Sequence, residues 1–259
     1  NTLVLLFYYF SNGGINVSKS DAKTNIGLRR KLNQDMFFTS DAPVGNLKNL
    51  YIVADGMGGH NAGDLASRYT VEIMVEQIKS SQQQNPENIL LEAIREANRF
   101  VRQKAYENPD LHGMGTTVVA ATFVGKHMLV ANVGDSRLYL VGDTIEQITV
   151  DHSLVEEMVQ MGGIDRSVAR NHPDKNIITR AIGAKDTVDP DFFHRIVEPG
   201  QFVLLCSDGL TNMVEDERIQ AIIMGDGAIS EKVDLLVDEA NHNGGKDNIS
   251  AIIVDPFVE

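Results

Sequence analysis

The sequence predicts an α+β fold in which antiparallel β-sheets are covered by helices. Strand-like apolar runs and helix-like periodic segments occur in groups along the chain. The regular alternation of strand and helix that builds a doubly wound parallel sheet is missing. The helix-like segments carry apolar residues at helical spacing, so each has one face for packing against a sheet.

The first half of the chain is expected to hold two strands and then two helices. Residues 15–25 are consistent with a strand, and the apolar run 50–54 ends abruptly at Asp55, before a glycine-rich turn. Apolar residues then recur at helical spacing in two segments: Tyr69, Ile73, Met74 and Ile78, followed by Leu90, Ile94, Ala97 and Val101. Pro86 stands near the start of the second helix, where proline is tolerated. These stripes indicate core packing rather than a ligand site.

The middle of the chain predicts a β-hairpin. Residues 116–124 and 127–142 are strand-like, with a turn at Gly125-Lys126 between them. The second run carries Gly134 and Asp135 in its middle. A glycine inside a strand suggests a bulge or a close approach, and an aspartate there needs a compensating partner.

The last third begins with a capped helix and an irregular stretch. Ser153 with Glu156 predicts a capping box, and Gly162-Gly163 should end that helix. Residues 164–187 are expected to be irregular. Regular structure should resume with a strand at 201–209, helices near 216–224 and 231–242, and a strand at 248–255.

Composition limits the kinds of partner. The chain has 259 residues, 42% hydrophobic and 23% charged, as in an ordinary globular protein, and we find no repeat or linker. The net charge of −13 argues against nucleic acid or an anionic membrane and allows a cation-binding pocket. Cys206 is the only cysteine, which excludes an intrachain disulfide and fits a reducing compartment. We expect a cytoplasmic monomer without a nucleic-acid or membrane partner.

The N-terminus is atypical. Residues 2–10 are apolar or nearly so, yet the basic region and cleavage site of a signal peptide are not visible. We interpret residues 1–14 as an extra segment, which is either a remnant of a vector or upstream sequence or a sticky hydrophobic addition.

Four aspartates form a possible site: Asp55, Asp135, Asp208 and Asp247. Each flanks an apolar strand, so packing of the strands can gather the carboxylates in one cleft. Carboxylates at close range repel and need protons or cations between them. Without a Cys or His set at zinc-like spacing, oxygen ligands favour Mg²⁺ or Mn²⁺, with Ca²⁺ possible. For Asp55 alone, a solvated residue in a tight strand-to-helix connection is an equal alternative. Arg29–Lys31 beside Asp35 fit either a surface ion pair or an anion-binding residue next to a metal ligand.

Five ordered motifs carry a family resemblance: Arg30–Asp35, Asp55-Gly56 with the glycines after it, Gly134–Arg137, Ser207–Gly209 and Asp247-Asn248. Together they resemble the metal-dependent PP2C-type (PPM) Ser/Thr protein phosphatases, and DGMGGH is similar to the bacterial branch. The resemblance covers residues 15–256, expected as one domain. It implies an αββα sandwich of two antiparallel sheets flanked by antiparallel helices.

The resemblance also implies the roles of the site residues. Asp55 would bridge two Mn²⁺ or Mg²⁺ ions, the Gly56 carbonyl would bind one, and Asp208 and Asp247 the other. Asp35 would hold metal-bound water directly or from outside the coordination sphere, and Asp135 with Asp208 would form a third metal site. Arg30 would receive the substrate phosphate, which makes Arg30 and Asp55 the expected catalytic residues. Residues 153–190 correspond to the flap of the family, which we expect to govern the choice of protein substrate.

One position departs from animal members, which carry a histidine, proposed as a general acid, two residues after the bridging aspartate. This chain has Met57 there. His60 is either a substitute or a plain turn residue, and metal-bound water could donate the proton instead. His152 is expected to orient the turn before the capped helix.

The predicted function is hydrolysis of phosphoserine and phosphothreonine in proteins by a metal-activated water, without a phosphoenzyme. The expected partners are phosphorylated proteins, including a cognate Ser/Thr kinase in the same cytoplasm. Two alternatives stay open: a metal-dependent enzyme acting on phosphodiesters or small phosphorylated molecules, and a pseudophosphatase that only binds a partner. The second would show loss of metal-binding acids, and none is missing.

Overall fold

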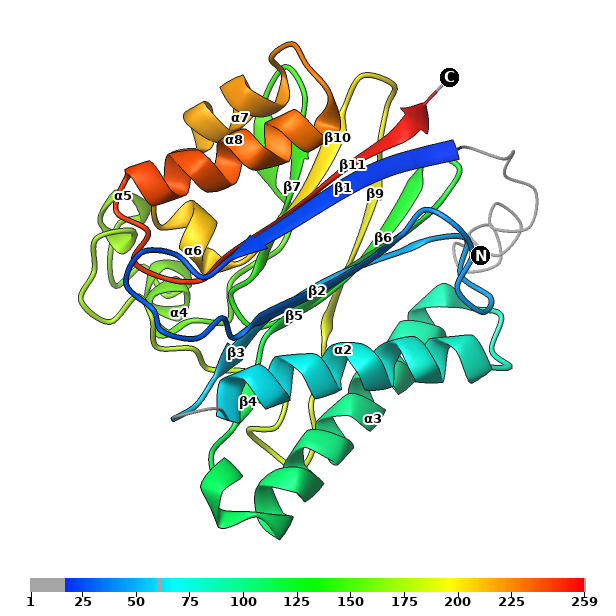
Figure 1. The fold of residues 1–259 in the computed structure, drawn as a ribbon, viewed down its shortest axis with the longest axis vertical. Helices are drawn as coiled ribbons and strands as arrows, with labels where there is room; N and C mark the ends of the chain where they lie inside the picture. Colours follow the sequence, from blue (N-terminus) through cyan, green and yellow to red (C-terminus); the bar gives the residue numbers. More distant parts are fainter. Residues whose placement is uncertain (1–16, 60–61, 259) are drawn as a thin grey trace.

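The structure, a computed structural model, describes residues 17–59 and 62–258. It confirms the αββα sandwich: two antiparallel sheets pack face to face, and helices cover both outer faces (Figure 1). The extra segment 1–14 and His60 lie outside the described residues. Within the described ranges, no helix combines the length and apolar character needed to cross a bilayer.

The first sheet is built from both ends of the chain and its middle. Its strand order is β1 (Val17–Asn25), β11 (Ile249–Val258), β10 (Phe202–Cys206), β7 (Arg137–Val141) and β8 (Ile145–Gln147). The helices on its outer side are α7 (Asp216–Ile223) and α8 (Ile229–His242). The short helix α6 (Asp208–Thr211) is separated from the end of β10 by one residue, Ser207, which is its N-cap.

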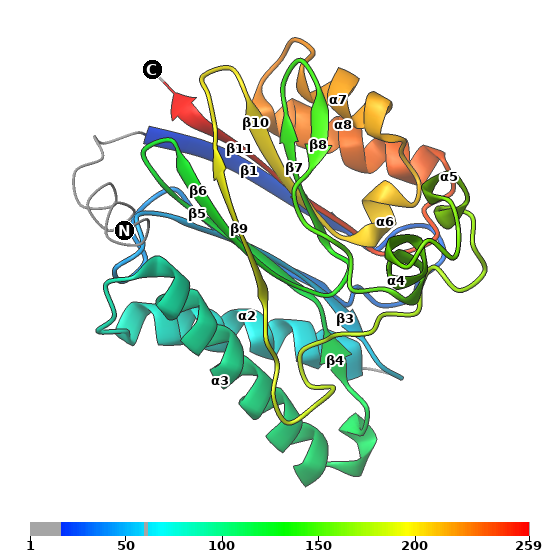
Figure 2. The same ribbon diagram turned by 180° about the vertical axis from the view of Figure 1, so that it is seen from behind.

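The second sheet carries the glycine-rich turn. Its strand order is β2 (Asp35–Ser40), β3 (Leu50–Met57), β5 (Val118–Val124), β6 (His127–Val133) and β9 (Asp191–Ile196), and β4 (Gly115–Thr116) pairs with the end of β3. Figure 2 shows two long helices across its outer face, α2 (Ala62–Ser80) and α3 (Pro86–Glu107). The short 3₁₀ helix η1 (Pro109–Leu111) follows them.

Apolar side chains fill three layers. On β3, Tyr51 and Val53 point between the two sheets, whereas Ile52 points into the core under α2 and α3. On β10, Leu205 faces the other sheet and Leu204 faces α7 and α8. Because the central strands are buried on both faces, their sequences are continuous apolar runs rather than alternating ones.

The hairpin prediction is confirmed for β5 and β6, with its turn at Gly125-Lys126. The prediction of one strand over 127–142 is wrong. The chain leaves the second sheet after Val133 and enters the first sheet at Arg137. Gly134 redirects it with a φ of +106°, and a Cβ there would lie 2.6 Å from a methyl group of Thr117. Asp135 therefore lies in a crossover between the sheets and not inside a strand.

The flap segment contains α4 (Leu154–Gln160) and α5 (Arg166–Ala169). Ser153 Oγ accepts the Glu156 amide at 3.2 Å, but the Glu156 carboxylate turns to Arg166 at 2.7 Å, so only half of the predicted capping box forms. Helix α4 ends as expected, with Gly162 at a φ of 71°. The stretch 164–187 is irregular apart from α5 and isolated bridges.

Candidate metal centre

The topology brings the predicted acids to one end of the sandwich. Asp35 and Asp55 lie opposite each other on the antiparallel strands β2 and β3. Asp208 lies two residues after β10 and Asp247 two residues before β11, and these strands are also antiparallel neighbours. Asp135 joins them from the crossover. Burial, and then the charges of the other four carboxylates, raise the pKa of Asp55 well above its usual range.

Asp35 is the most enclosed member of the cluster, with 6% of its surface exposed. Its Oδ2 accepts hydrogen bonds from the hydroxyls of Ser207 at 2.8 Å and Ser250 at 2.7 Å. Its Oδ1 is buried and has no hydrogen-bond partner among the described residues. Burial raises the pKa of Asp35 to about 7, although the two hydroxyls oppose the shift.

Asp55 and Asp208 perturb each other: the charge of Asp208 adds to the rise in the pKa of Asp55, whereas the Asp55 carboxyl group lowers the pKa of Asp208. Burial first, and then the charge of Asp247, raise the pKa of Asp208 to about 6, against the opposing effects of Arg137 and Lys175. Two buried carboxylates whose charges act on each other in this way need a proton or a cation between them. The pair is therefore arranged to take up positive charge.

Two glycines let the segments that bear the acids approach each other. The Gly56 amide donates to the Gln34 carbonyl at 3.0 Å, and a Cβ at Gly56 would lie 2.1 Å from the carbonyl oxygen of Gly63. A Cβ at Gly209 would lie 1.9 Å from the carbonyl oxygen of Asn248. No side chain fits at either place, so the motif glycines serve close backbone packing.

The loop between β1 and β2 carries Arg30 to the cluster. Asn248 holds this loop by donating to the carbonyls of Ile26 at 2.9 Å and Leu32 at 3.0 Å. Arg30 then extends its Nη2 to within 2.6 Å of Asp247 Oδ2, with about half of its side chain exposed. The guanidinium thus lies half-exposed at the edge of the cluster, where it is paired with Asp247.

Hydroxyl contacts hold Asp135 near Asp55. Thr117 Oγ1 accepts the Asp55 amide at 2.9 Å and contacts the Ser136 hydroxyl at 2.7 Å. The Nδ1 of His152 accepts the amide N–H of the residue before Asp135 at 3.0 Å. This contact agrees with the expected orienting role of His152, whose pKa burial lowers.

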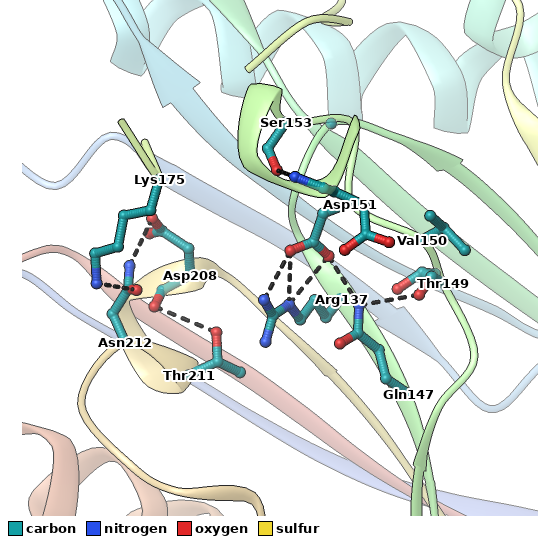
Figure 3. A network of polar contacts seen from close by, with 12 residues as sticks. Arg137, Gln147, Thr149, Val150, Asp151, Ser153, Lys175, Asp208, Thr211 and Asn212 are labelled. Atoms are coloured by element: carbon teal, nitrogen blue, oxygen red, sulfur yellow. Dashed lines mark hydrogen bonds and ion pairs between the residues drawn. The ribbon is translucent and has the colours of Figure 1, made fainter. Parts of the chain in front are cut away.

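A polar cavity of about 280 Å³ adjoins Asp135 and Asp208, beneath the flap. Arg137 lies at one side of it and donates to both oxygens of Asp151, at 3.0 and 2.7 Å (Figure 3). Both signs of charge line this cavity, so it is not a simple anion pocket.

The donor set fits a hard divalent cation. Carboxylate oxygens dominate it, one buried oxygen of Asp35 lacks a partner among the described residues, and the charges of Asp55 and Asp208 act on each other. As the side chains of the described residues stand, no three acids, histidines or cysteines enclose one ion. Asp247 is turned onto Arg30 instead, so binding a cation requires this side chain to reorient.

No sequence motif predicts a role for the polar residues that hold the acids. They are Thr117, Ser136, Lys175, Ser207, Asn212 and Ser250. Thr117 and Lys175 carry no local signal. The other four stand one to four residues from a motif aspartate or asparagine, which is the only indication that the sequence offers.

Comparison with known proteins agrees with this architecture. A family model described as protein phosphatase 2C matches residues 29–230. The serine/threonine phosphatase stp of Listeria innocua is 42% identical over 211 residues, which cover 80% of this chain and 84% of that protein. The S. agalactiae serine/threonine phosphatase structure has 36% identity and a TM-score of 0.86, covering 93% of this chain and 100% of that one. A structure of the PstP catalytic domain with two manganese ions has 31% identity and a TM-score of 0.82, covering 93% and 99%. The chain belongs to the protein phosphatase 2C family.

Proposed function

We propose that this chain hydrolyses phosphoserine and phosphothreonine in proteins and depends on divalent metal ions. The observation that carries the proposal is a cluster of five carboxylates, in which burial and neighbouring charges raise the pKa of Asp55 and of Asp208, so that the cluster calls for cations. Family membership supports the reaction and the phosphoprotein substrate, because the curated relatives are named serine/threonine phosphatases.

We assign two Mn²⁺ or Mg²⁺ ions to this cluster. Asp55 and the Gly56 carbonyl would hold one ion, and Asp55 with Asp208 and Asp247 the other. Asp35 would hold water of the coordination sphere through its unpartnered Oδ1. Asp135 with Asp208 would supply a third, weaker site. When bound, such ions lower the pKa of water and neutralise phosphate charge.

The side chains of the protein position the phosphate. The Arg30 guanidinium pairs with two phosphate oxygens, a geometry that lysine does not reproduce. The phosphoryl group passes directly to water, so no side chain becomes phosphorylated. Met57 lies at the end of β3, and its thioether has no proton to donate. Protonation of the leaving alkoxide therefore falls to water in the site.

The wider setting is also part of the proposal. Residues 15–256 form one catalytic domain, in which the flap, residues 153–190, selects protein substrates. The enzyme acts as a monomer in the cytoplasm, where Cys206 stays reduced, and a Ser/Thr kinase of the same compartment supplies and shares its substrates. The acidic surface charge supports the absence of nucleic-acid and membrane partners.

Hydrolysis of a phosphothreonine peptide by protein stripped with EDTA tests the reaction. Activity should be absent until Mn²⁺ is added. Asp55→Asn should lower kcat more than about a hundred-fold, the upper end of the effect of partners outside the coordination sphere. Full activity of the stripped protein would contradict the metal assignment. Faster turnover of small phosphate esters than of any phosphopeptide would favour a small-molecule phosphatase instead.

A further inference from the structure

The flap reaches across the polar cavity and contacts the segment that carries Asp208. In Figure 3, dashed lines join Lys175 of the flap to Asn212, and Asn212 to Asp208. Lys175 Nζ donates to Asn212 Oδ1 at 2.8 Å, and Asn212 Nδ2 donates to Asp208 Oδ2 at 2.9 Å. A flap side chain is therefore only one amide away from a proposed metal ligand.

The donor and acceptor groups of these three residues fix the orientation of the Asn212 amide. The ammonium group of Lys175 can only donate, so it must face the oxygen of the Asn212 amide. The amide NH₂ then points to Asp208, whose carboxylate can accept. We call this chain of hydrogen bonds from Lys175 through Asn212 to Asp208 the relay. It holds one carboxylate oxygen of Asp208 and leaves the other outside it. Lys175 thus determines that the NH₂ group of the Asn212 amide, and not its oxygen, faces Asp208.

A second contact fastens the same part of the flap. Arg170 donates to the Val214 carbonyl at 3.1 Å, and its Nε lies 3.1 Å from the Glu215 carboxylate. These two residues lie two and three positions after Asn212 in the chain. The flap therefore contacts the segment that follows α6 at two points. Because α6 begins at Asp208, both contacts lie close to this aspartate in the chain.

We propose that Lys175 is a positioning residue, which orients Asp208 through Asn212 and thereby couples the flap to metal binding. The inference rests on the proposed metal site at Asp208. Residues just outside a coordination sphere orient the ligands, and their loss commonly weakens metal binding about 10- to 100-fold. Coupling is reciprocal, so an ion that orders Asp208 must also order the flap around Lys175.

Calorimetric titration of Mn²⁺ into metal-stripped protein, without substrate, measures this role. Lys175→Met should weaken one class of Mn²⁺ sites by about ten-fold. Lys175→Arg should restore most of the affinity, because a guanidinium can still donate to Asn212. Asn212→Ala should weaken binding as much as Lys175→Met, and the double variant should be no worse than either single one.

Arg166→Met is the matched control. Arg166 is also a cation of the flap beside the same cavity, but it pairs with Glu156 inside the flap at 2.7 Å. Its loss should leave Mn²⁺ affinity unchanged. Equal weakening of Mn²⁺ binding by Arg166→Met and Lys175→Met would mean that only the positive charge of the flap matters, which would overturn the relay. Wild-type Mn²⁺ affinity in Lys175→Met would overturn it as well.

Hydrogen exchange provides a second measurement that does not require activity. Mn²⁺ should slow amide exchange around residues 170–177 in the wild type, and less so in Lys175→Met. Equal protection in both proteins would overturn the coupling. A wild type that binds no Mn²⁺ would instead contradict the proposed metal site, so the two failures are distinguishable. Circular dichroism of the metal-free variants checks that they fold.

Discussion

Arg30 and Asp247 form an ion pair across the edge of the acidic cluster, with 2.6 Å between Arg30 Nη2 and Asp247 Oδ2. The residue expected to receive phosphate is thus bound to a residue expected to hold a metal. Burial opposes the charge of Arg30, but the carboxylates of Asp247, Asp55 and Asp208 together raise its pKa. A cation that takes Asp247 would release the guanidinium for the phosphate. If Arg30 and Asp247 have these roles, this pair connects metal binding with substrate binding.

Arg30→Ala separates the two roles. The KM for a phosphothreonine peptide should rise about ten-fold, since a hydrogen bond between charged groups contributes about 1.5 kcal/mol at a half-exposed site. Calorimetric Mn²⁺ affinity should be unchanged or higher, because Asp247 loses its competing partner. Arg29→Ala, which removes the neighbouring exposed charge, is the control and should change KM little. An unchanged KM in Arg30→Ala would make Arg30 an ordinary surface charge.

Metal-free protein should lose stability as pH rises. The pKa of Asp35 is about 7 in the folded state and that of Asp208 about 6, both above the ordinary value of 3.8. At a pH between the ordinary pKa and these raised values, the folded state binds more protons than the unfolded state. The free energy of unfolding therefore falls with increasing pH. The melting temperature of EDTA-treated protein should therefore decrease from pH about 5.5 to about 8, and the gain from added Mn²⁺ should grow over the same range.

Asp35→Asn tests the origin of this dependence. The amide is uncharged at every pH, so the pH-dependent loss of stability in the metal-free protein should become smaller. Glu107→Gln, on the exposed end of α3, is the control and should keep the wild-type profile. A wild-type melting temperature that rises with pH under EDTA would mean that the cluster is not protonated in the absence of metal.

The sequence alone was sufficient to predict which acids come together. Asp55, Asp208 and Asp247 each adjoin an apolar run, and the ends of packed strands meet at the edges of sheets. Their supporting hydroxyls could not be predicted in this way. Ser207 and Ser250 contact Asp35 across 172 and 215 residues of sequence, and no local pattern specifies such a contact.

The two-sheet topology shows a second limit of local patterns. An apolar run indicates burial but does not say in which sheet a strand lies, so 127–142 was predicted as one strand. The Gly134-Asp135 step was visible, yet a bulge and a crossover have the same local signal. The contact of Gly134 with Thr117 distinguishes them, and it depends on the packing of β5 against β6.

Gly56→Ala should disturb the centre through the backbone. The added Cβ would lie 2.1 Å from the Gly63 carbonyl and 2.5 Å from that of Gln34, and backbone atoms cannot turn away as side chains do. We expect a loss of about 1–3 kcal/mol in the free energy of unfolding, measured by urea titration, together with weaker Mn²⁺ binding. Gly59→Ala is the matched control in the same turn, because a Cβ there meets nothing within 4 Å. Similar losses in both variants would point to turn flexibility rather than to close packing.

The flap presents apolar side chains to solvent beside the centre. Met161, the C-cap residue of α4, is 84% exposed, and Val168, within α5, is 52% exposed. Deleting 166–178 would also remove Lys175, so point substitutions test substrate choice more cleanly. Met161→Ser with Val168→Ser should lower kcat/KM for a phosphoprotein several-fold, about the effect of losing one or two buried apolar contacts. Turnover of p-nitrophenyl phosphate should not change, because that ester is too small to reach these side chains. Equal losses on both substrates would show that the flap supports the chemistry itself, and its role in substrate recognition would have to be abandoned.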